Sequence, residues 1–71
     1  NLEKEQTGQL LEKQLQRRLL KLQYLKDMFQ RYQGVPSSNS EDFGDYIVLE
    51  GAVLREEANI TWLKKCMEYL K

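Results

Sequence analysis

Residues 34–40 read Gly-Val-Pro-Ser-Ser-Asn-Ser, and this stretch near the middle of the chain decides the fold. It holds the only proline of the 71 residues, next to a glycine and among small polar side chains. Proline cannot continue a helix and glycine readily ends one, so the stretch predicts a helix end followed by a loop. We therefore expect one regular element on each side of a loop at residues 34–40.

The residues before this loop predict one long helix. From Leu2 to Gln33 there is no proline, and Gly8 is the only glycine. Leucine, glutamine, lysine, glutamate and arginine dominate, and these residues are strong helix formers. The expected helix runs from about residue 3 to about residue 33.

A second helix is expected from about residue 41 to about residue 70. Ser38 and Glu41 have the spacing of a capping box, which predicts a helix start near them. Two glycines weaken this helix, and residues 46–49 (Tyr-Ile-Val-Leu) favour a strand by propensity, so a strand is the alternative there. Apolar residues at helical spacing favour the helix: Phe43, Ile47, Leu54, Ala58 and Trp62.

Each expected helix carries two apolar stripes, whereas one antiparallel hairpin can cover only one stripe per helix. We predict that the first stripes form the helix-packing core, with Leu15, Leu22, Phe29, Ile47, Leu54 and Trp62. The second stripes predict a dimer interface, with Leu20, Tyr24, Met28, Leu63 and Met67. Each large apolar side chain that becomes buried contributes about 1.5–3 kcal/mol, so the uncovered stripes favour a second copy.

The sequence thus predicts an all-α fold of two long antiparallel helices that dimerises into a four-helix bundle or a coiled-coil-like assembly. The alternative is that the second stripes pack on a part of the same chain that is absent from this sequence, without a dimer. The chain begins at Asn1 and its first methionine is Met28, so we expect residues 1–71 to be one dimerisation domain, a C-terminal fragment of a longer protein.

Composition argues against several functions. Eleven basic and eleven acidic residues give a formal net charge of zero, which argues against DNA binding by this chain alone. There is no histidine, and the single Cys66 cannot form a disulfide within the chain. We expect no catalytic residue, no metal site and no cofactor. No apolar run approaches the roughly 20 residues of a membrane span, so we expect a cytoplasmic protein without a membrane partner.

Three groups of residues could carry chemistry, and each has a simpler interpretation. Lys13, Arg17, Arg18 and Lys21 could contact phosphates, but a solvated helix flank is favoured. Glu56 and Glu57 could act as a carboxylate pair, but solvated surface groups are favoured. Cys66 could be a redox switch, but a small buried side chain is favoured.

One part of the sequence resembles a known family. Asp45-Tyr46-Ile47-Val48-Leu49-Glu50-Gly51, then Glu56-Glu57-Ala58 and Ile60-Thr61-Trp62-Leu63-Lys64-Lys65-Cys66, resemble the C-terminal region of PadR-like transcriptional regulators. The resemblance covers roughly residues 10–71. It implies an N-terminal winged helix-turn-helix that reads DNA and a C-terminal helical pair that forms a homodimer.

The resemblance therefore implies a dimerisation domain of a bacterial regulator, which holds two winged-helix domains at the spacing of DNA half-sites. DNA would be contacted only through an N-terminal domain that is not in this sequence, and the full-length protein could bind a small-molecule effector. The alternative function is a helical coiled-coil adaptor that binds an unrelated protein partner.

Overall fold

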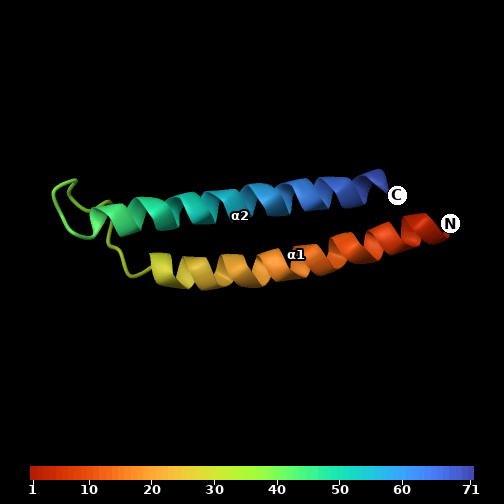
Figure 1. Cartoon of the computed structure of the whole chain (residues 1–71), viewed down its shortest axis with the longest axis horizontal. Helices are drawn as coiled ribbons and strands as arrows, with labels where there is room; N and C mark the ends of the chain where they lie inside the picture. The colour runs from red at the N-terminus through yellow and green to blue at the C-terminus, as the bar shows by residue number, and fades with distance from the viewer.

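The computed structural model describes all 71 residues and shows a hairpin of two helices. Helix α1 spans Leu2–Phe29 and helix α2 spans Phe43–Tyr69. The helices run antiparallel and side by side, with both chain termini at one end and the connecting loop at the other (Figure 1). The predicted all-α hairpin is confirmed. The alternative of a strand at residues 46–49 is excluded, because these residues lie inside α2.

Helix α1 begins with a side-chain cap and ends earlier than expected. The Asn1 Oδ1 atom accepts a hydrogen bond from the Lys4 backbone N–H at 2.8 Å, which satisfies one free donor of the first turn. At the other end the helix stops at Phe29, although the following residues are still good helix formers. Its end therefore lies four residues before the predicted residue 33.

Aromatic packing explains this early end. The Phe29 ring lies 5.1 Å from the Tyr46 ring, measured between centroids. Tyr32 meets Tyr46 edge-on, at 5.2 Å and 83°. Edge-on aromatic pairs are favourable beyond the area that they bury. By leaving the helix, the chain brings Tyr32 onto α2, and the three rings close the loop end of the hairpin.

The loop is longer than expected, and α2 starts later. Gly34 has a φ of +105°, which L-residues rarely adopt, and it lies within the loop rather than directly after the helix. The predicted capping box of Ser38 and Glu41 does not form. Instead the Ser40 Oγ atom accepts a hydrogen bond from the Asp42 backbone N–H at 3.1 Å, so a local turn precedes Phe43.

The two helices meet along one seam with heptad spacing. On α1 the inward positions recur every three or four residues: Leu11, Leu15, Arg18, Leu22, Leu25 and Phe29. On α2 they follow the same rule: Tyr46, Leu49, Val53, Glu56, Ile60, Leu63, Met67 and Leu70. This repeat keeps a seam facing its partner helix along the whole length of an antiparallel pair.

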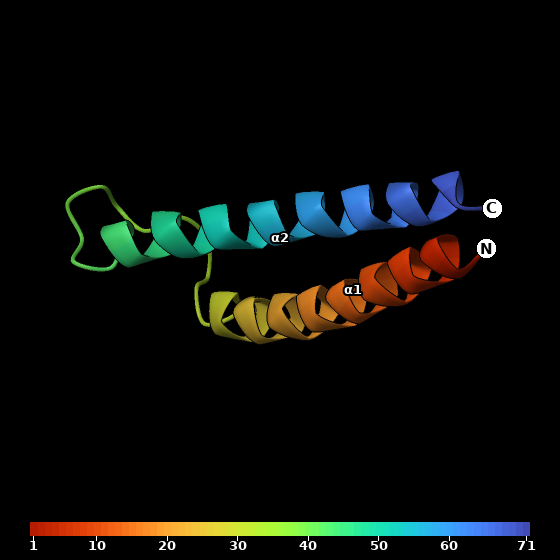
Figure 2. The ribbon, with the colours of Figure 1, turned by 45° about the vertical axis from the view of Figure 1, so that its right-hand side comes forward.

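The hairpin is a rod and not a globule. Its extents are 56 × 16 × 14 Å and its radius of gyration is 16.3 Å, whereas a compact chain of this length has about 11 Å. The view turned by 45° shows the same two-helix rod (Figure 2). Only six residues are buried. Each helix is therefore covered along one side and open along the rest.

Candidate interaction surface

The stripe of α2 that faces α1 is the opposite of the predicted one. Ile47, Leu54 and Trp62 were expected in the helix-packing core, but they are 49%, 59% and 59% exposed. Val53, Ile60 and Leu63 of the other stripe pack on α1 instead, and Leu63, which was expected in a dimer interface, is only 5% exposed. Tyr46 gives the physical reason, because its contacts with Phe29 of α1 and with Tyr32 of the loop fix the rotation of α2 about its own axis.

On α1 the predicted stripes lie as expected. Leu15, Leu22 and Phe29 lie half-buried along the seam. Leu20 and Tyr24 are exposed on the outer side, and Met28 is half-buried. Met67, on α2, lies among the inward positions of the seam with Leu63 and not on an outer face. A single hairpin does not test a dimer contact of Leu20, Tyr24 or Met28.

The middle of the seam holds a buried charge that the sequence interpretation missed. Glu56 is 4% exposed, so it is not the solvated carboxylate that was expected. Its Oε1 atom accepts a hydrogen bond from an Arg18 guanidinium N–H at 2.8 Å and lies 3.5 Å from the Lys21 ammonium. Its Oε2 atom is buried and has no hydrogen-bond partner. The sequence did contain a signal of this burial. Glu56 lies seven residues after Leu49 and seven before Leu63, and residues seven apart share one face of a helix.

This ion pair sets the register of the hairpin. Removing two charges from water offsets much of their attraction, so a buried pair is weak evidence for stability. A single polar layer in a heptad seam does fix register, because any slip would leave the charges unpaired. The pair also divides the basic cluster: Arg18 and Lys21 contact Glu56, whereas Lys13 and Arg17 form no ion pair.

Tyr46 is the buried hydroxyl at the loop end of the seam. Burial raises the pKa of its phenol above the ordinary 10.0, because the charged form would lose its hydration. The carboxylate of Glu50 accepts a hydrogen bond from this hydroxyl at 3.3 Å and raises the pKa further. Tyr46 therefore stays neutral and holds the aromatic contacts at neutral pH.

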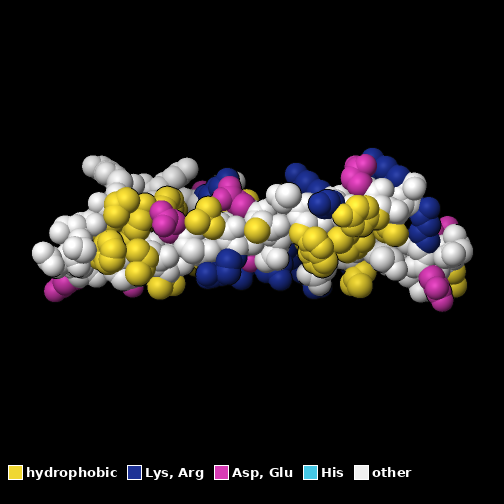
Figure 3. Space-filling model, turned by 90° about the horizontal axis from the view of Figure 1, so that it is seen from above, with side chains coloured by type: hydrophobic (Ala, Val, Ile, Leu, Met, Phe, Trp, Pro, Cys, Tyr) yellow, Lys and Arg dark blue, Asp and Glu magenta, His cyan; other side chains and the backbone are white.

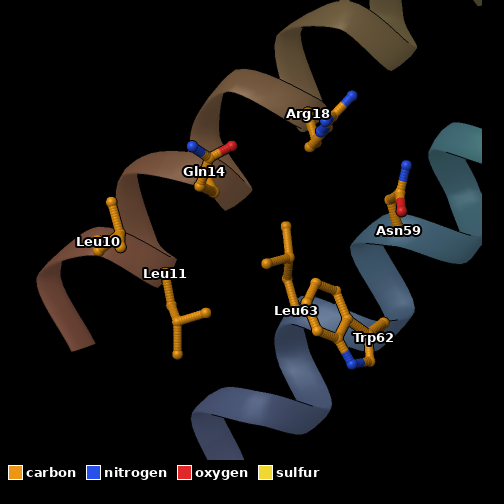
Figure 4. Close-up of a pocket in the computed structure, with 7 residues that line it drawn as sticks. All are labelled: Leu10, Leu11, Gln14, Arg18, Asn59, Trp62 and Leu63. Carbon is orange, nitrogen blue, oxygen red and sulfur yellow. The ribbon is translucent and has the colours of Figure 1, made fainter. Parts of the chain in front are cut away.

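A groove of about 260 Å³ opens between the helices near the free ends of the chain. Leu11 and Leu63 point into the space between the helices, and the Trp62 ring lies on its α2 side (Figure 4). The lining combines apolar and polar side chains: Leu10, Leu11, Gln14, Arg18, Asn59, Trp62 and Leu63. The groove therefore leads from the seam to the exposed tryptophan.

The outer side of α2 carries uncovered apolar surface. Seen from above, onto α2, apolar side chains gather in clusters along the rod (Figure 3). The exposed large apolar residues of this helix are Ile47, Val48, Leu54, Trp62 and Tyr69. The chain exposes 5775 Å², about 1,100 Å² more than the roughly 4,700 Å² expected for a compact monomer of its mass.

Other kinds of site find no support in the side chains. No three acidic or cysteine residues come together as a metal ion would require. Cys66 is free and half-buried. Neither helix contains a stretch that is long and apolar enough to cross a membrane.

These features define a class of protein: a helical hairpin domain with one closed seam and one open apolar face. The profile of a known family, described as virulence activator alpha C-term, matches residues 1–71. The chain belongs to this family, which makes it a helical C-terminal domain of a virulence activator, consistent at this coarse level with transcription regulation. No curated protein and no solved structure matched the chain.

The resemblance to PadR-like regulators was wrong, because the matching profile is that of a different family. The quoted segments are short and mostly apolar. Within them, Ile60 and Leu63 pack in the seam and Trp62 lies on the open face. Apolar residues in this arrangement are required by any hairpin with a closed seam and an open stripe, so they do not distinguish one helical family from another.

Proposed function

We propose that this hairpin is a dimerisation domain of a DNA-binding transcription activator and joins two copies through its open apolar face. One observation carries the proposal: large exposed apolar side chains recur along α2 at Ile47, Leu54, Trp62 and Tyr69, on the side opposite the seam. A dimer would hold two DNA-binding domains at a fixed separation, as half-sites about one helical turn apart require. Dimerisation needs no catalytic group, cofactor or metal ion.

The elongated shape leaves surface that such a contact could cover. A standard interface buries about 800 Å² on each partner, and the hairpin exposes about 1,100 Å² more than a compact monomer. Exposed apolar patches of several hundred Å² mark association surfaces in soluble proteins. A two-fold contact along the rod would therefore reduce the surface that its elongated shape exposes.

Sedimentation equilibrium of the 71-residue chain tests this proposal. From low micromolar to millimolar concentration, we expect a reversible transition from one copy to two. The helical circular dichroism signal should persist in both states. A fully helical single copy at millimolar concentration would contradict the proposal and favour an adaptor that uses the same face for an unrelated helical protein.

A further inference from the structure

Ala58 lies near the middle of the open stripe of α2. Ala58 is exposed on the outer side, opposite the seam. Stripe positions recur four, seven and eleven residues before it, at Leu54, Gly51 and Ile47. They recur at the same distances after it, at Trp62, Lys65 and Tyr69. At 3.6 residues per turn, all seven positions fall on one face of the helix.

In an antiparallel two-fold contact the same patch meets itself, so each position of the stripe pairs with the position at the same distance on the other side of the axis. We propose that α2 packs antiparallel against α2 of a second copy, with the two-fold axis at Ala58. The inference rests on the proposed dimerisation and adds its face, orientation and register. Leu54 then meets Trp62 of the partner subunit, and Ile47 meets Tyr69 of the partner subunit.

Residue size supports this register. Ala58 faces Ala58 of the partner subunit at the axis, where the helices are closest and a small side chain permits the approach. Each large aromatic ring faces an aliphatic side chain, so no two rings compete for the same space. Trp62 and Leu54 are both largely exposed in the single hairpin, and each would cover the other.

Charge supports the register as well. Gly51 has no side chain, so Lys65 of the partner subunit can extend across it toward Glu50. Lys65 forms no ion pair within the chain, and Glu50 contacts only the Tyr46 hydroxyl. The Arg55 guanidinium now covers Gly51, at 3.1 Å from where a Cβ atom would lie. Arg55 has the same charge as Lys65, so its flexible end has to move away from Gly51 before Lys65 of the partner subunit can reach Glu50.

The outer side of α1 is a poor alternative for the same contact. A two-fold axis that pairs Leu10 with Tyr24 of the partner subunit would pass through Arg17. It would place Arg17 against Arg17 of the partner subunit and Lys13 against Lys21 of the partner subunit. Like charges opposed in this way repel and disfavour the contact. The stripe of α2 has one charged position, and that position faces a glycine.

Cysteine cross-linking tests the register directly. In a Cys66→Ser background, Ala58→Cys places two thiols across the axis, within the roughly 7 Å between Cα atoms that a disulfide allows. We expect rapid oxidation to a covalent dimer. A mixture of Leu54→Cys and Trp62→Cys chains should form the mixed dimer in preference to either self-linked dimer. Leu20→Cys, on the outer side of α1, is the matched control and should remain unlinked.

A charge substitution provides a second test that does not depend on oxidation. Ala58→Arg places like charges at the axis and should weaken dimerisation about a hundredfold or more. The hairpin itself should keep its helical signal, because Ala58 lies outside the seam. Leu20→Arg adds the same charge to α1 and should leave the dimer affinity unchanged. Trp62 is the only tryptophan, so its emission should shift to the blue on dimerisation in Leu20→Arg but not in Ala58→Arg.

The outcomes separate this inference from the proposed function. Cross-linking at Ala58→Cys and loss of the dimer in Ala58→Arg support the register. A chain that sediments as a dimer but cross-links at Leu20→Cys and not at Ala58→Cys overturns the register and leaves dimerisation standing. A chain that stays single at every concentration overturns both.

Discussion

The two faces of α2 both carry large apolar side chains but have different surroundings. On the inner face Val53, Ile60 and Leu63 are buried against α1. On the outer face Leu54 and Trp62 are mostly exposed. The inner face also contains the buried carboxylate Glu56, whereas the seven positions of the outer stripe contain no acidic residue. Of the two stripes, the one that contains a carboxylate forms the core.

The comparison shows that one charged residue does not exclude a stripe from the core. Glu56 is tolerated in the seam because α1 supplies Arg18 at 2.8 Å and Lys21 at 3.5 Å. A charge is buried when a partner is available, and that partner lies 38 residues away in the sequence. The following predictions test how different the two faces are, from the largest expected effect to the smallest.

Breaking the ion pair of the inner face should cause the largest loss of stability. Arg18→Ala leaves Glu56 with only Lys21, and we expect a loss of about 3 kcal/mol in the free energy of unfolding, because breaking a buried pair leaves a charge without its partner. Urea denaturation at fixed chain concentration measures it. Arg17→Ala, which removes an exposed arginine without an ion pair, is the matched control and should change little.

The double variant Arg18→Leu with Glu56→Leu should recover the stability lost in Arg18→Ala. Apolar residues of similar volume often replace a buried pair without loss. A double variant as unstable as Arg18→Ala would show that the effect of Arg18 does not pass through Glu56.

Leucine truncation compares the faces directly. Leu63→Ala removes a buried side chain and should lower the free energy of unfolding by about 2.5 kcal/mol. Leu54→Ala removes an exposed one and should have an effect of about 0.5 kcal/mol or less at concentrations where the chain is single. Thermal denaturation at low concentration measures both. Equal losses there would contradict the assignment of the faces.

Two glycines of α2 provide a finer comparison. Alanine stabilises a helix interior by about 1 kcal/mol relative to glycine. At Gly44 an added Cβ meets nothing within 4 Å, and at Gly51 it meets only the movable end of Arg55. Both Gly44→Ala and Gly51→Ala should therefore raise the melting temperature by similar amounts in dilute solution. A loss of stability in Gly51→Ala alone would mean that the outer face is more tightly packed than the structure shows.

Alkaline pH should have the smallest effect on stability, and it should act through Tyr46 at the loop end of the inner face. The pKa of Tyr46 is raised above 10.0 in the folded chain, so the folded state binds the phenolic proton more tightly than the unfolded state. Its contribution is fully present below pH 10.0 and is lost as the pH rises through the folded value. Tyr46→Phe should show a shallower loss of stability above pH 10.0 than the unchanged chain. The exposed Tyr24→Phe should follow the unchanged chain, and identical curves for all three would contradict the prediction.

Much of the fold could be predicted, because it depends on local properties. The residues before the loop are strong helix formers and include no proline, which predicts α1. The only proline marks the loop. Helical spacing predicted α2 despite the strand propensity of residues 46–49. The helix ends were less predictable, because Phe29, Tyr32 and Tyr46 meet only in the folded hairpin. Ring packing and a local Ser40 turn, rather than the expected capping box, set the boundaries of the loop.

The sequence by itself determined that two amphipathic helices form and that each has more apolar surface than one neighbour can cover. This holds because helix propensity and residue spacing act over a few positions of the chain. Only the tertiary structure decided that Val53, Ile60 and Leu63 close the seam and that Leu54 and Trp62 remain open. The rotation of α2 is set by contacts between distant residues, Tyr46 with Phe29 and Glu56 with Arg18, and no pattern within one helix contains them.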